Sequence, residues 1–294
     1  MTVSSRRAAV LGHPIGHSKS PLLHRAAYRY LGFDCSYEAV DLAEEDAPVF
    51  AASLRRPGTQ PWAGLSVTMP LKSVFVPAMD RLAPAAAALQ VLNTITFDET
   101  DHGVVLTGHN TDVAGIVSAL RQAGSRPLPR TVIIGAGGTA CAAVAAAGIL
   151  GASTVDVFAR RFPDAGDGTA AVQTAGIRTG TPVSLHPWQD AAAACAEADV
   201  VICTLPPRAA DGLAETIDAA GRDRTGAVLL DVAYDPWPSR IAAAWSGAGG
   251  TVVAGVEMLL YQAVEQVRLF TGDAFHDEAG VTNAMCDAVG IPRR

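Results

Sequence analysis

Residues 131–161 read TVIIGAGGTACAAVAAAGILGASTVDVFARR, and this stretch decides the expected fold. Its first four residues are all β-branched, which is typical of a buried strand. A glycine-rich segment follows at once, and residues 139–150 then predict an alanine-rich helix that ends before Gly151. Residues 154–158 predict a second strand. The order strand, glycine loop, helix, strand predicts an α/β fold with a Rossmann-like, doubly wound parallel sheet.

Small residues in the glycine loop have separate uses. Gly135 permits a tight turn out of the strand, and Gly137 lacks a Cβ, so a pyrophosphate can approach the backbone. Ala140 lets the helix pack close to the sheet, and the free N–H groups at the start of the helix face the phosphates. Such a pattern alone can be just a loop. The flanking strand and helix favour dinucleotide binding.

The end of the second predicted strand indicates which dinucleotide binds. An NAD site usually carries an acidic residue there for the ribose 2′-hydroxyl, whereas this chain has Arg160 and Arg161. Two guanidiniums can hold a 2′-phosphate through charge-assisted, bidentate hydrogen bonds. The alternative is a solvated arginine pair. We expect NADP rather than NAD as the cofactor, and comparable kcat/KM values for the two would contradict this.

Composition limits the other classes of function. The 294 residues suffice for two domains, and 49% hydrophobic with 17% charged residues is typical of a globular protein. The net charge of −7 provides no basic field for nucleic acid. No apolar run approaches the length of a membrane span or a signal peptide. Five cysteines without a CxxC pair suggest buried thiols in a reducing compartment, so we expect a cytoplasmic protein.

The region before the glycine loop predicts a second α/β arrangement. Strands are expected at residues 8–11, 37–40 and 62–68, and a β-hairpin at 92–97 and 104–108 with its turn at 98–101. Beyond Arg161, strands at 182–185, 199–203, 227–231 and 251–254 are expected to extend the parallel sheet. Thr204 and Tyr234 follow two of these strands, at the edge where open α/β sheets bind ligands.

Polar residues of the first region suggest a binding site. Ser20 is a natural N-cap of a helix, which leaves the Ser18 hydroxyl freer to meet a ligand. Ser66 and Thr68 point to the same side of a strand. Lys72 is expected at the start of a helix just beyond it. These groups fit a polyol site, although a solvated surface lysine is the commoner role of any single lysine.

Two other polar residues permit both a structural and a functional interpretation. Asp112 opens a helix, where a carboxylate is favoured by the dipole alone. Gln262 lies four residues after Met258 on one helix face, and a satisfied core amide is its alternative. His13 and His17 are also four apart, but Pro14 between them disfavours a shared helical face. We therefore expect no metal site.

The whole chain resembles the shikimate dehydrogenase family. The resemblance is carried by motifs in family order: GHPIGHSKSP at 12–21, SVTMPLK at 66–72, NTI at 93–95, NTD at 110–112, GAGGTA at 135–140, YDP at 234–236 and GVEMLLYQ at 255–262. It departs from the family pattern at Ser66 (usually Asn), at Arg161 (usually Thr) and at residues 204–207 (usually containing Asn-Ala-Thr).

The resemblance implies an enzyme with two domains and its site in the cleft between them. Residues 1–113 with 256–294 would form the substrate-binding catalytic domain, and residues 114–255 the NADP-binding Rossmann-like domain. The reaction would interconvert 3-dehydroshikimate and shikimate in aromatic amino-acid (chorismate) biosynthesis. The expected partners are this small molecule and NADP, with a homodimer as a further possibility. Quinate/shikimate dehydrogenases using NAD, or a binding protein that has lost the chemistry, are the alternatives.

The resemblance also implies roles for individual residues. Lys72 and Asp112 would be the catalytic pair. The substrate would contact Ser18, Ser20, Ser66, Thr68, Lys72, Asn93, Asp112, Tyr234 and Gln262. The cofactor would contact Gly135, Ala136, Gly137, Gly138, Thr139, Ala140, Arg160, Arg161, Thr204, Val232, Gly255 and Met258. Reduction of a ring ketone needs a hydride from the cofactor and a proton, and our hypothesis is that Lys72 donates the proton.

Overall fold

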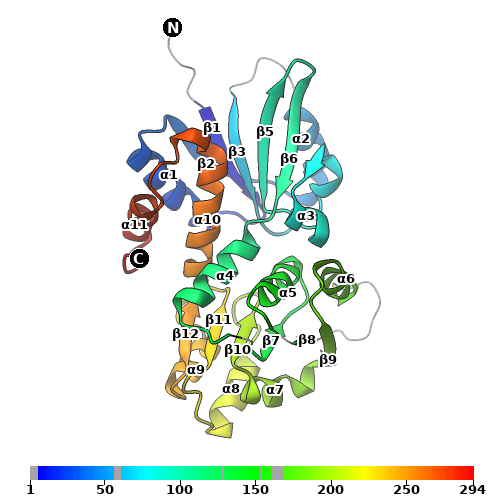
Figure 1. Cartoon of the computed structure of the whole chain (residues 1–294), viewed down its shortest axis with the longest axis vertical. Helices are drawn as coiled ribbons and strands as arrows, with labels where there is room; N and C mark the ends of the chain where they lie inside the picture. Colours follow the sequence, from blue (N-terminus) through cyan, green and yellow to red (C-terminus); the bar gives the residue numbers. More distant parts are fainter. Residues whose placement is uncertain (1–5, 56–60, 128, 153, 161–168) are drawn as a thin grey trace. The chain divides into compact units, whose positions relative to one another are not determined.

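The structure is a computed structural model, and it describes residues 6–55, 61–127, 129–152, 154–160 and 169–294 (Figure 1). It divides into two compact units. The first unit comprises Met1–Thr111 and Leu260–Arg294, and the second comprises Asp112–Leu259. Each unit is built around its own sheet of six strands.

The sheet of the first unit is mixed, with strand order β2-β1-β3-β5-β6-β4. Its strands are β1 (Arg6–Gly12), β2 (Cys35–Asp41), β3 (Trp62–Val67), β4 (Arg81–Leu82), β5 (Thr94–Thr100) and β6 (Gly103–His109). β1 pairs in parallel with β2 and β3, and β4 pairs in parallel with β6. β5 runs antiparallel to both β3 and β6.

The two faces of this mixed sheet differ because side chains alternate along each strand. Leu65 and Val67 of β3 enter an apolar core that also contains residues of α2 (Ala47–Ser53) and α3 (Pro84–Leu89). Between them, Ser66 points to the opposite face. There α10 (Gly255–Thr271) lies against the sheet so closely that a side chain at Gly64 would overlap the Phe270 ring.

The remaining helices of the first unit lie beside the sheet. α1 (Ser20–Leu31) packs against β2 and against α11 (Glu278–Val289). The Tyr30 hydroxyl of α1 donates to Asp277, the N-cap residue of α11, at 2.5 Å. In the first unit, α10 covers the sheet, and α1 and α11 pack together next to α10 (Figure 1).

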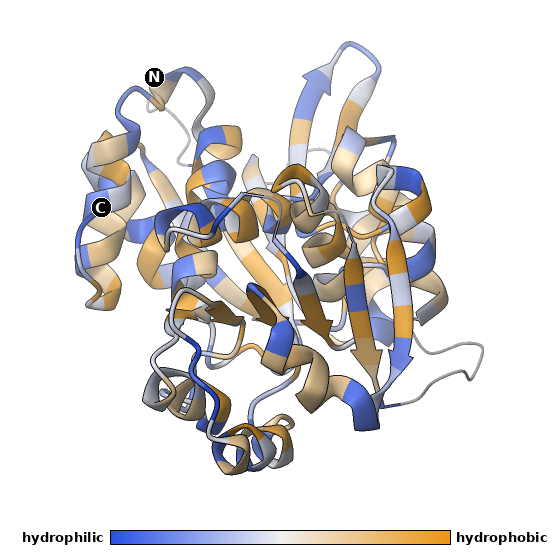
Figure 2. Ribbon diagram, turned by 60° about the horizontal axis from the view of Figure 1, so that its bottom comes forward, coloured by the Kyte–Doolittle hydropathy of each residue, from blue (hydrophilic) through white to orange (hydrophobic). Residues whose placement is uncertain are grey.

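The sheet of the second unit is parallel throughout, with order β12-β11-β10-β7-β8-β9. Its strands are β7 (Thr131–Ile134), β8 (Val155–Ala159), β9 (Val183–Pro187), β10 (Val200–Cys203), β11 (Val228–Asp231) and β12 (Thr251–Ala254). Counted along the chain this is the Rossmann order, whose switch point lies between β7 and β10. The expected Rossmann-like fold is confirmed. The central strand β10 is apolar throughout, and its neighbour β7 is apolar after Thr131. Hydrophobic residues are orange in Figure 2.

Helices of the second unit form two layers. α7 (Ala191–Glu197), α8 (Asp211–Ala220) and α9 (Arg240–Gly247) share one core with β7, β10 and β11, and this core includes the fully buried Trp245. α4 (Asp112–Gln122), α5 (Gly138–Ile149) and α6 (Thr169–Thr179) pack side by side in the other layer. Residues 140–147 of α5 are all buried, which requires the small side chains of its sequence.

Several local predictions are wrong. The N-cap of α1 is Lys19, not Ser20. Lys72 lies in a turn (residues 69–75) followed by a 3-10 helix, Val76–Ala78, and not at the start of an α-helix. The hairpin turns at residues 101–102, later than expected, because β5 continues to Thr100. Within the described ranges, no helix is both long and apolar enough to cross a membrane.

Candidate active site

The turn after β3 places Lys72 beside the start of β5. The Thr68 N–H donates to the Leu11 carbonyl at 2.8 Å, which fixes the end of β3 against β1. The Lys72 carbonyl accepts from the Leu92 N–H at 3.0 Å, and the Asn93 carbonyl accepts from the Val67 N–H at 2.7 Å. The main chains of Lys72, Thr68 and Asn93 are therefore held at one edge of the first sheet, the carboxyl end of β3.

Asn93 is the centre of a buried hydrogen-bond cluster and is 2% exposed. Its Nδ2 donates to Thr111 Oγ1 at 2.9 Å and to Gln262 Oε1 at 3.2 Å. Its Oδ1 accepts from the Thr111 N–H and from Thr94 Oγ1, both at 2.8 Å. Two predicted site residues, Asn93 and Gln262, are thus in direct contact, and Asp112 is the next residue after Thr111.

Gln266, one turn after Gln262 on α10, is a polar residue that sequence reasoning missed. Its Oε1 accepts from Ser66 Oγ at 2.8 Å and from His24 Nε2 at 3.1 Å. Its Nε2 donates to the Asn93 carbonyl at 3.0 Å and to Thr94 Oγ1 at 2.9 Å. The available signal was a second glutamine four residues after the first on an apolar helix.

The aromatic and imidazole groups behind Gln266 are buried and neutral. His24 is fully buried and stacks on the Tyr37 ring with centroids 4.1 Å apart. Burial lowers the pKa of His24 to about 3, although its hydrogen bond with Gln266 acts in the opposite direction. Burial also raises the pKa of Tyr37 well above its usual value. Tyr37 donates to Ser66 Oγ at 2.7 Å.

Ser18 and Ser20 meet at the start of α1. Ser18 Oγ accepts from the Ser20 N–H at 3.3 Å, so Ser18 satisfies a backbone donor of the first turn. Ser18 is only partly buried and its O–H hydrogen can still donate, which agrees with the expectation that Ser18 is the freer of the two hydroxyls. Ser20 is buried and its hydroxyl lies in hydrogen-bond contact with Tyr37.

The glycine loop of the second unit lies at the switch point of the parallel sheet. Gly135 has φ +113°, and a side chain there would overlap Thr204 Oγ1. Thr204 follows β10, and its N–H and hydroxyl both donate to the Ile134 carbonyl, at 2.8 and 2.9 Å. These two hydrogen bonds hold the start of the glycine loop against the residue that follows β10.

The space around the start of α5 fits a dinucleotide phosphate. Gly137 is the N-cap of α5 with φ −83°, and a Cβ at this position would meet no atom within 4 Å. Ala140 is fully buried against the sheet. The first N–H groups of α5 are available to an anion by the geometry of a helix start. Ala136, Gly138 and Thr139 belong to the same loop and first turn.

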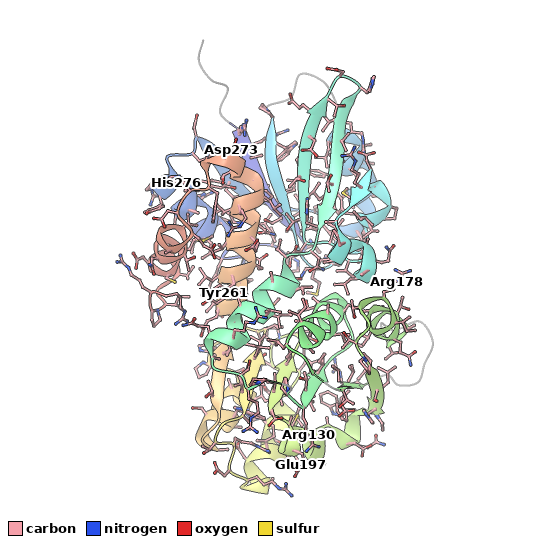
Figure 3. All side chains as sticks on the ribbon, viewed as in Figure 1. Arg130, Arg178, Glu197, Tyr261, Asp273 and His276 are labelled. Carbon is pink, nitrogen blue, oxygen red and sulfur yellow. The ribbon has the colours of Figure 1, made fainter. Side chains whose placement is uncertain are left out.

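The other predicted cofactor residues lie along the same edge of the parallel sheet. Arg160 is exposed directly after β8, whereas Arg161 lies outside the described residues. Gly255 begins α10 directly after β12, where a side chain would overlap the main chain of Val232 beyond β11. Met258 follows in the first turns of α10 and is buried. By contrast, Arg130 and Glu197 pair at 3.9 Å at the opposite edge (Figure 3).

A buried carboxylate holds the loop that carries Tyr234. Asp231, the last residue of β11, accepts from the Ala233 N–H at 3.2 Å and from Ser239 Oγ at 2.5 Å. Burial raises the pKa of Asp231, and these hydrogen bonds oppose that rise. Tyr234 lies between the two contact points, so the Asp231 carboxylate sets the conformation of its loop.

His13 and His17 lie in the segment after β1. The His13 Nδ1 lies 2.6 Å from the Asp41 carboxylate, and both side chains are exposed. Among the residues that the structure describes, no three His, Cys, Asp or Glu side chains are grouped closely enough to hold a metal ion. The described cysteines are all free thiols, and Cys35 alone of them is not fully buried.

A Rossmann-ordered sheet with a glycine turn at its switch point defines the class of the second unit as a dinucleotide-binding α/β unit. Residues 10–95 match the shikimate dehydrogenase substrate binding domain, and residues 255–274 match the shikimate 5'-dehydrogenase C-terminal domain. The chain is 36% identical to shikimate dehydrogenase (NADP(+)) of Geobacter sp. (strain M21), with 99% of this chain and 98% of the relative covered. The chain belongs to the shikimate dehydrogenase family.

Solved structures agree with this family. Mycobacterium tuberculosis shikimate dehydrogenase is 37% identical with a TM-score of 0.80, covering 96% of this chain and 99% of its own. Shikimate 5-dehydrogenase from Thermus thermophilus, in complex with NADP(H) and shikimate, is 27% identical with a TM-score of 0.73 and the same coverage. The resemblance expected from the motifs is confirmed.

Proposed function

We propose that this chain catalyses the NADP-dependent interconversion of 3-dehydroshikimate and shikimate, a step of the shikimate pathway. The activity is supported by the 36% sequence identity to a shikimate dehydrogenase (NADP(+)), which extends over 99% of this chain. The observation that carries the proposal within this chain is a Rossmann-ordered sheet with a glycine turn, together with a first unit in which Asn93 and Gln262 share a buried polar cluster and the main chain of Lys72 is held next to Asn93 through Leu92.

Each unit has its own part in the proposal. The first unit binds the substrate through Ser18, Ser20, Ser66, Thr68, Lys72, Asn93 and Gln262. The second unit binds NADP through the glycine loop, Arg160, Arg161, Thr204, Val232, Gly255 and Met258, and contributes Asp112 and Tyr234 to the substrate. The fit of the second unit rests on the open space at Gly137 and the exposed guanidinium of Arg160.

The proton chemistry is assigned to Lys72 and Asp112. NADPH, when bound, supplies the hydride for the ring carbonyl. Lys72 donates the proton to the resulting oxygen, and in the reverse direction it accepts the proton from the hydroxyl. Asp112 orients the ammonium and accepts from a substrate hydroxyl. The chain contains two lysines, Lys19 and Lys72, against 20 arginines, so lysine is not its ordinary surface cation. An amine can lose a proton near neutral pH when its surroundings favour it, whereas a guanidinium cannot.

The test is an absorbance assay of the reduced cofactor with shikimate and with quinate, each with NADP and with NAD. We expect the highest kcat/KM with shikimate and NADP. Arg160→Ala should raise the KM for NADP and leave that for NAD nearly unchanged, because the guanidinium contacts the 2′-phosphate alone. Arg178→Ala, an equal charge change at an exposed position of α6 (Figure 3), is the control. Preference for quinate with NAD would contradict the proposal.

Compartment and assembly complete the proposal. The free, mostly buried thiols of the described cysteines fit a reducing cytoplasm, where disulfides do not persist. A homodimer is the assembly we expect, and light scattering of the purified chain measures it. A monomer would remove the dimer from the proposal and leave the activity unaffected.

A further inference from the structure

Gln266 uses the full hydrogen-bonding capacity of its side chain inside the first unit. A glutamine amide has two donor hydrogens and two acceptor lone pairs. Ser66 and His24 fill the acceptor side, and the Asn93 carbonyl and Thr94 hydroxyl fill the donor side. The side chain is 1% exposed, so these four contacts are made without competition from water. Gln266 thereby joins α1, β3 and β5 through α10.

The partners of Gln266 fix the direction of every hydrogen bond around it. The Asn93 carbonyl can only accept, so the amide NH₂ must face it and Oε1 must face Ser66 and His24. Since Oε1 cannot donate, the Ser66 hydroxyl gives its hydrogen to Gln266 and accepts from Tyr37. For the same reason His24 carries its hydrogen on Nε2. The neutral state of His24, whose pKa is lowered by burial, agrees with this arrangement.

We propose that Gln266 is a positioning residue for the substrate site. It holds the main chain of Asn93 and the hydroxyl of Ser66, and Asn93 in turn holds Gln262. Gln266 therefore sets where these substrate-binding groups lie and how they are polarised. Because the hydrogen of Ser66 is committed to Gln266, Ser66 can meet a hydroxyl of the substrate as an acceptor but cannot donate to its carboxylate. This inference rests on the proposed function.

The first test compares Gln266→Met with wild type in steady-state kinetics. Methionine keeps the approximate volume and loses all four hydrogen bonds. We expect the KM for shikimate to rise roughly tenfold or more, because Asn93 and Ser66 lose the hydrogen bonds that fix their positions, with the KM for NADP nearly unchanged. Thr271→Val is the matched control, because Thr271 is buried on the same helix and its hydroxyl donates only to the Val267 carbonyl. The control should leave both KM values unchanged.

A second variant covers the case in which Gln266→Met does not fold. Gln266→Glu keeps the shape and the acceptor oxygen but, when ionised, cannot donate to Asn93 or Thr94. Its KM for shikimate should fall toward the wild-type value as the pH is lowered, because the protonated acid regains one donor. The wild-type KM should not show this extra dependence.

The outcomes separate the two proposals. A variant that lowers Tm while its KM for shikimate equals that of wild type, at every pH, would make Gln266 a purely structural residue and overturn the inference. Absence of shikimate oxidation by the wild-type chain itself would instead overturn the proposed function. If the wild-type chain oxidises shikimate and both variants have an altered KM for shikimate, the positioning role is supported.

Discussion

At the scale of single residues, the buried polar side chain of Gln266 is satisfied by partners far away in the sequence. Gln266 contacts Ser66, 200 positions earlier, and His24, 242 positions earlier. The spacing of four from Gln262 places Gln266 on the same helix face, but no local pattern encodes which residues it contacts. Gln262 could be singled out because its motif resembles a family. The same reasoning could not reach its neighbour one turn later.

His24 makes the stability of the fold depend on pH. Its pKa is near 6.5 in an unfolded chain and is lowered by burial to about 3 in the fold. The folded state therefore binds fewer protons between these values, and stability should fall as the pH falls through this window. One group contributes about 1.4 kcal/mol per pH unit there.

Urea unfolding at several pH values between about 6.5 and 4 measures this contribution. His24→Gln should fold less stably but lose less stability on acidification than wild type, because glutamine does not titrate. His276→Gln, at an exposed histidine, should keep the wild-type slope. An acid slope of His24→Gln equal to that of wild type would contradict the lowered pKa, because His24 would then take up its proton over the same pH range in the folded and unfolded states.

At the scale of elements, fully buried strands were predictable and irregular segments were not. β7 is buried along its whole length and matches the expected residues, because a strand covered on both faces is a continuous apolar run. The partly exposed edge strand β12 matches its expected residues as well. β4 has two residues, Arg81 and Leu82, and offers no periodicity. The turn with Lys72 was mistaken for a helix, although Pro70 and Pro77 on either side disfavour one.

Two glycines of the loop before α5 should respond differently to a methyl group. Gly135→Ala places a side chain at φ +113° and against Thr204, which should lower the free energy of unfolding by at least about 1–3 kcal/mol. Gly137→Ala adds its methyl group at an ordinary φ and in open space. It should leave stability nearly unchanged and raise the KM for NADP, because the methyl occupies the approach of the pyrophosphate.

Chemical denaturation and the KM for NADP of both variants check this pair. Each glycine serves as the control for the other, since the chemical change is identical. Equal losses of stability in both variants would contradict the structural role of Gly135. An unchanged KM for NADP in Gly137→Ala would place the phosphates elsewhere.

At the scale of the whole molecule, the sequence predicted two α/β parts and a Rossmann-like sheet, and the structure has both sheets. The strand order of the mixed sheet was beyond sequence reasoning. β5 and β6 form a local hairpin, but β3 pairs with β5 across an intervening strand and two helical segments. Such pairings depend on packing rather than on residue type. The proposed reaction needs both parts, since one provides the lysine and the other the glycine turn.

The most direct measurement is steady-state kinetics of Lys72→Ala with shikimate and NADP, beside Lys19→Ala, which removes the only other lysine amine of the chain. We predict that kcat of Lys72→Ala falls by about 10²–10⁴-fold, the usual effect of losing a general acid–base group, while Lys19→Ala stays near wild type. A Lys72→Ala enzyme with the wild-type kcat and only a raised KM for shikimate would contradict the account and make Lys72 a binding residue.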